Sequence, residues 1–168
     1  MNKKIFAIST LLMALSLLVL PVLATPAEII PVTIVSIKVG ENNDLLRTWT
    51  TNGDIFQARG KTVTYNFVIT IPDEAPITGI SENTLNTRIN NKIDVATIIY
   101  DVTWTSSDGA FVGKIQQKIF DYSLGYTMFT LQLHGTLRGT GAYQGQTLRV
   151  TYEGGFIGAV WDGILIRP

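Results

Sequence analysis

The 168-residue sequence contains no cysteine and only one histidine, His134. Without cysteine there are no disulfides and no cysteine-linked lipid anchor, so packing and backbone pairing must hold the fold together. A single histidine excludes metal sites built on histidine pairs, and no serine lies in a nucleophile-elbow pattern. No acidic segment has the alternating oxygen donors of a calcium loop. We therefore expect neither a metal nor a cofactor.

Charge is also scarce, and it is balanced. Only 15% of the residues are charged, with 13 Lys and Arg against 13 Asp and Glu. Nucleic-acid binding needs an excess of basic residues gathered on one face. We therefore expect no nucleic-acid partner.

The N-terminus has the order of a secretory signal. Lys3 and Lys4 precede an apolar stretch at 5–20, and the small residues Val22 and Ala24 follow it. This order predicts a signal peptide with cleavage after Ala24. A permanent anchor would need about 20 apolar residues, more than this stretch provides.

Cleavage at that point divides the chain into residues 1–24, the signal peptide, and residues 25–168, one domain of 144 residues. A domain of this size buries about two thirds of its unfolded surface. We expect the domain to be secreted or extracytoplasmic, with no stable membrane insertion after cleavage.

No long stretch repeats its apolar residues with the 3.6-residue period of a helix. Apolar and polar residues instead alternate one by one, as in strands with one covered face. In 62–71, for example, Val63, Tyr65 and Phe67 alternate with polar residues. His134 falls on a polar face, which predicts a solvated position. The segments read as strands are 31–39, 54–59, 62–71, 95–104, 110–120, 126–139, 146–153 and 159–166, with a weaker one at 45–50.

One interval departs from this pattern. Residues 72–94 are polar and contain two prolines, and they predict a lid or crossing loop with one short helical turn from Ser81, or else a floppy connector. Short strands separated by turn residues favour an all-β sandwich or barrel, and alternation alone leaves both open.

Glycines gather in "HGTLRGTGAYQG", from His134 to Gly145, between two alternating segments. Such residues permit a tight reversal at the rim of a sheet, with the Tyr143 ring folded back over its end. An ordinary glycine-rich hairpin is the simpler interpretation. We do not expect a phosphate loop, because the Gly-Lys-Ser/Thr ending and the strand-to-helix context are missing.

Within this stretch "GTGAYQG", at 139–145, resembles the late hairpin of the allene oxide cyclase-like barrels, a superfamily that includes the dirigent proteins. The resemblance covers about residues 108–155. It implies a single antiparallel eight-stranded β-barrel after the signal peptide. It also implies self-association into dimers or trimers, although no residue here specifies it. No catalytic residue is carried over, and the chain lacks the further glycine that members place soon after this hairpin.

Polar residues in phase with apolar faces are the candidate ligand-binding residues, because a buried polar group needs a partner. Gln117 is in phase with Phe111, Ile115 and Ile119. Asp162 is in phase with Val160, Ile164 and Ile166, and if buried it is the acid or base to test first. The full set of candidates is Tyr65, Tyr100, Gln117, Tyr152 and Asp162.

These residues predict an apolar cavity with a few hydrogen-bonding points, or else a filled core in which they pair with each other or with the backbone. The first interpretation is a secreted barrel that binds a small apolar molecule, with a cofactor-free isomerase or cyclase as its catalytic form. The second is a non-catalytic extracellular or surface protein with a packed core. An outer-membrane barrel is a third, disfavoured by scattered aromatic residues and by the proline-containing loop.

Overall fold

The computed structural model describes residues 26–124, 130–154 and 160–168, and the predicted signal peptide lies outside them. The described chain is all-β apart from one short 3₁₀ turn, and none of its helices is long and apolar enough to cross a membrane. The elements are β1 (Glu28–Asn42), β2 (Arg47–Thr51), β3 (Ile55–Thr70), β4 (Ile77–Asn90), β5 (Val95–Ser106), β6 (Gly109–Phe120), η1 (Tyr122–Leu124), β7 (Thr130–Gly141), β8 (Thr147–Gly154) and β9 (Val160–Arg167).

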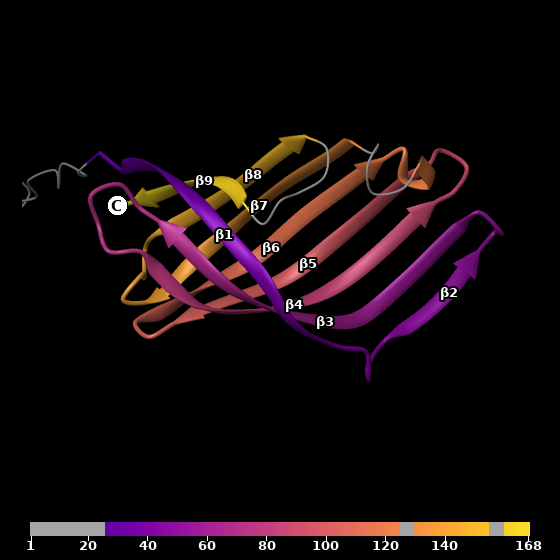
Figure 1. The fold of residues 1–168 in the computed structure, drawn as a ribbon, viewed down its shortest axis with the longest axis horizontal. Coiled ribbons are helices and arrows are strands. Elements are labelled where there is room, and N and C mark those ends of the chain that lie inside the picture. Colours follow the sequence, from indigo (N-terminus) through magenta and orange to yellow (C-terminus); the bar gives the residue numbers. More distant parts are fainter. Residues whose placement is uncertain (1–25, 125–129, 155–159) are drawn as a thin grey trace, which may run out of the picture.

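Eight of the strands form a closed antiparallel barrel. The sheet order runs β1-β9-β8-β7-β6-β5-β4-β3, and β3 pairs back onto β1 to close it. β1 spans the seam because residues 28–35 pair with β9 while residues 33–42 pair with β3. Figure 1 shows β1 crossing the front of the barrel, with β2 at one end beside the start of β3. The predicted barrel architecture is confirmed.

β3 joins two segments that the sequence analysis treated as separate strands. Its residues 55–59 pair with β2, and its residues 62–70 pair with β1. Between them the register shifts at Gly60, whose φ of 84° suits glycine. The bulge changes the alternation phase, so the two segments look unrelated in the sequence.

The prediction of a lid or loop with a helical turn over residues 72–94 was wrong. β4 occupies most of this interval and pairs along its length with β3 and β5. Its inward positions include Ser81 and Asn83, which are 1% and 4% exposed, whereas Ile80 faces outward and is 53% exposed. Because these inner positions are polar, β4 does not show the alternation of apolar and polar residues from which the other strands were predicted.

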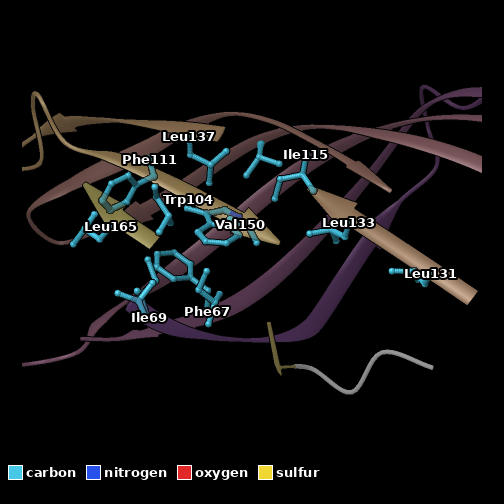
Figure 2. Packing of buried hydrophobic residues seen from close by; sticks show 14 of the residues in the cluster. Phe67, Ile69, Trp104, Phe111, Ile115, Leu131, Leu133, Leu137, Val150 and Leu165 are labelled. Carbon is cyan, nitrogen blue, oxygen red and sulfur yellow. The ribbon is translucent and has the colours of Figure 1, made fainter. Parts of the chain in front are cut away.

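Inner faces were correctly predicted for most of the other strands. Trp104 packs near the middle of the apolar core, stacked on Phe67 at 5.3 Å between ring centroids. In Figure 2 it lies between Phe67 and Phe111, while Leu133 lies further along the barrel. Phe129, also predicted to face inward, falls outside the described residues.

β9 was assigned the wrong face. Val160, Asp162 and Ile164 are exposed, and Gly163 and Leu165 are buried. Because β9 is apolar on both sides, its alternation does not indicate which side faces the core.

The glycine-rich stretch forms the end of β7 and the turn into β8. The Tyr143 ring stacks on Phe111 at 4.9 Å between centroids, and its hydroxyl lies 2.9 Å from Ser106 Oγ at the β5–β6 turn. A Cβ on Gly139 would lie 2.0 Å from the Tyr143 carbonyl oxygen, so a glycine is required there. The expected return of the tyrosine over the end of the sheet is confirmed.

Gly135, in the middle of β7, is required for a different reason. It pairs with Ile115 and Val150 in a row of inward positions, and a Cβ there would lie 2.6 Å from Ile115 Cγ1 and 2.8 Å from the Lys114 carbonyl oxygen. The Ile115 side chain therefore lies against the β7 backbone at this point and leaves no space for a side chain on residue 135.

We expect Gly135→Ala to lower the free energy of unfolding by about 1–3 kcal/mol, because the added methyl group would clash with the Ile115 side chain and the β6 backbone. Gly40→Ala is the control, since its Cβ would meet only Thr64 Cβ, at 3.9 Å. Urea unfolding of both variants measures the difference. Equal losses of stability would contradict the close packing at Gly135.

Candidate functional site

A layer of polar side chains crosses the inside of the barrel. Ser81 and Asn83 come from β4, and the Ser81 hydroxyl donates to Asn83 Oδ1 at 2.7 Å. Gln117 on β6 is 9% exposed, and Ser36 on β1 is 7% exposed. Buried polar groups are costly unless they are paired, so this layer reduces stability relative to an apolar one and needs internal partners.

A cavity of about 30 Å³ lies in this layer. This volume has room for one or two waters and is much smaller than a typical ligand pocket. Its lining consists of two aliphatic side chains and five side chains that can form hydrogen bonds: Ile115, Leu133, Tyr65, Asn83, Tyr100, Gln117 and Trp161.

Tyr100 and Gln117 are joined directly, because the Tyr100 hydroxyl donates to Gln117 Oε1 across the β5–β6 pair. Burial raises the pKa of Tyr100 well above the ordinary value of a phenol, so the group stays a neutral donor. Burial also raises the pKa of Tyr65, and the nearby Lys38 opposes this shift.

Two indole donors inside the barrel have no partner among the described residues, namely Nε1 of Trp104 and Nε1 of Trp161. Their rings lie 6.2 Å apart, and Trp161 also lines the cavity. An indole N–H can only donate, and leaving it unpaired costs about 1–3 kcal/mol. An acceptor atom near Trp161 would remove that cost.

Ionic side chains gather beside Tyr65, at the β1–β3 seam. Glu41 lies 3.1 Å from Lys61 Nζ and also pairs with Lys38, the residue opposite Tyr65 in the register. Hydrogen bonds first from Lys38 and then from Lys61 lower the pKa of Glu41 to about 2. The Glu41 carboxylate is therefore ionised at neutral pH.

The structure brings together three of the five residues proposed from the sequence. Tyr65, Tyr100 and Gln117 share the cavity wall. Tyr152 is partly buried and packs against the core opposite Leu133, but it is not part of that wall. Asp162 is exposed on the outer face, so the expectation that it faces the interior was wrong.

Sequence reasoning missed Asn83 and Trp161. Asn83 lies on the strand that was read as a loop, although the spacing of Ser81 and Asn83 matches one face of a strand. Trp161 is next to Asp162, and assigning the opposite phase to β9 would have placed it inside. His134 is exposed, as predicted.

Within the described ranges, no three His, Asp or Glu side chains converge in a way that could hold a metal ion. Comparisons with protein-family models, with curated proteins and with solved structures found no match. The likeness to the allene oxide cyclase-like barrels therefore depends on the glycine hairpin and on the shared barrel architecture.

We expect Tyr100→Phe to lower the free energy of unfolding at pH 7 by about 1–3 kcal/mol, because it leaves Gln117 Oε1 without its donor. The pH dependence of the free energy of unfolding should also change. Folding raises the pKa of this phenol above its unfolded value of about 10, so below pH 10 it is protonated in both states and stability does not depend on its ionisation. Above pH 10 only the unfolded state loses the proton, and the free energy of unfolding therefore falls.

Urea unfolding at pH 7 and at about pH 10.5 measures both effects, with Tyr152→Phe as the control. The loss of stability between the two pH values should be smaller in Tyr100→Phe than in the parent chain. If the parent chain and Tyr100→Phe lose the same stability, Tyr100 ionises as freely in the barrel as in the unfolded chain.

Proposed function

We propose that the chain acts, after export, as a binding barrel for a small and mostly apolar molecule that carries a hydrogen-bond acceptor. The observation that carries the proposal is the Nε1–H of Trp161, a residue of the cavity wall that has no hydrogen-bond partner for this donor among residues 26–124, 130–154 and 160–168. An acceptor oxygen on a ligand would pair with this donor, while Ile115 and Leu133 would contact the apolar body of the ligand.

The side-chain amide of Asn83 also supports a ligand with an acceptor. Asn83 lines the same wall, and its amide carries N–H donors besides the oxygen that accepts from Ser81. A pocket that combines apolar contacts with a few polar groups is the usual make-up of a small-molecule site. Because the cavity holds only about 30 Å³, a ligand larger than two waters must displace a wall side chain, and Tyr65, which is only partly buried, is the candidate.

Catalysis is not part of the proposal. The described lining has phenols, amides and an indole, but no carboxylate and no imidazole to serve as a general base. The small cavity volume and the dense packing around Trp104 favour a second candidate, a non-catalytic surface protein whose barrel core is filled.

A pair of matched probes distinguishes the two candidates. Cyclohexanone carries an acceptor oxygen, whereas methylcyclohexane has a similar apolar body without one. We expect cyclohexanone to shift the indole N–H resonance of Trp161 saturably in ¹H–¹⁵N NMR spectra, and methylcyclohexane to leave it unchanged. Trp49, partly exposed on β2, provides a reference signal in the same spectra.

Gln117→Leu should weaken cyclohexanone binding about fivefold, because it removes the amide N–H donors that Gln117 contributes to the cavity wall. Gln116→Leu makes the same change on the outward-facing neighbour and should leave affinity unchanged. If Trp161 does not respond to millimolar cyclohexanone, the packed-core candidate is correct and the binding proposal fails.

A further inference from the structure

The outer surface of the barrel has a groove of about 540 Å³ over β5 to β8. Gly135, which has no side chain, is part of its lining and lies between two rows of outward side chains. The groove lies on the opposite side of the sheet from the internal cavity. Its volume greatly exceeds that of a simple inorganic ion and suits a sugar-sized molecule.

Outward side chains line the groove in two rows that follow the strand register. In one row Lys114, Thr136 and Arg149 lie on three successive strands. In the other row Gln116, His134 and Thr151 occupy the same strands. With neighbouring strands about 4.8 Å apart, the two cationic residues flank Thr136 across about 10 Å.

The charge of the groove favours an anion. Arg149 has no carboxylate within ion-pair distance among the described residues, whereas Lys114 Nζ pairs with Asp101 at 2.9 Å. A guanidinium recognises a carboxylate or a sulfate through two parallel hydrogen bonds. Arg149 is therefore the main anion-binding group, and Lys114 adds charge that Asp101 partly offsets.

Most of the surface inside the groove is apolar, and a few hydroxyl and amide groups within it can bind a hydroxylated ligand. The hydroxyls of Thr136 and Thr151 and the amide of Gln116 can both donate and accept, as sugar hydroxyls require. Ile99, which is 39% exposed at the edge of the groove, offers an apolar surface for the C–H face of a sugar ring.

We propose that this groove binds a saccharide that carries a carboxylate, with the carboxylate on Arg149 above Thr136 and the hydroxyls towards His134 and Thr151. The site is separate from the internal cavity, and its occupation does not depend on the function proposed for that cavity. The ligand could be a free acidic sugar or the end of an acidic polysaccharide, since both present the same group.

His134 provides a direct measurement, because the chain has no other histidine and its imidazole protons give a single set of NMR signals. We expect D-glucuronate to shift these signals saturably and D-glucose to leave them unchanged. A short oligomer of galacturonate tests the polysaccharide source, and tighter binding than the monomer would assign the groove to a polymer end.

Arg149→Gln should weaken glucuronate binding about tenfold, the effect of losing a charge-assisted pair. Arg138→Gln is the matched control, because it removes the same charge from an outward residue of β7 that does not line the groove. Thr136→Val, a second variant within the groove, should also weaken binding.

Three outcomes would overturn the proposal. Inorganic sulfate that shifts His134 as strongly as glucuronate would indicate an adventitious ion only. Equal weakening by Arg138→Gln and Arg149→Gln would indicate unspecific attraction. The absence of a saturable shift in the folded parent chain would show that the groove takes no acidic sugar.

Discussion

The pairing of β1 with both β9 and β3 is the constraint on which the rest of the structure depends. Residues 33–35 pair on both edges, so the sheet has no free margin at that point and one of its faces is enclosed. Closure removes the edges that otherwise pair with other chains. It also determines which side chains face the same interior, and it leaves β2, which pairs only with β3, with one exposed edge.

The closed barrel encloses two kinds of side chain, apolar and polar. Around Trp104 the barrel is filled by large apolar side chains, whose burial stabilises the fold. Across the layer of Asn83, Tyr100 and Gln117 it holds polar groups that packing alone does not require. Ile115 lines both the internal cavity and the outer groove, so the two proposed sites lie on opposite sides of the same part of the sheet.

Sequence reasoning succeeded where alternation was strict and apolar on one side only, as in β5 and β6. It failed at β4, whose inner face carries Ser81 and Asn83, and at β9, where both faces are apolar. The lining of the internal cavity followed the same rule. Tyr65, Tyr100 and Gln117 could be predicted from their phase, whereas Trp161 required the register that pairs β9 with β1. The outer groove could not be predicted, because it depends on the register that brings outward residues of β6, β7 and β8 together around Gly135.

Hydrogen–deuterium exchange of the backbone amides tests the closure most directly. The account predicts that the amides of residues 33–35 in β1 exchange as slowly as those of β6, while amides on the free edge of β2 exchange fast. If β1 exchanges as fast as β2, the sheet is open at that seam, and the enclosed interior on which the cavity depends does not exist.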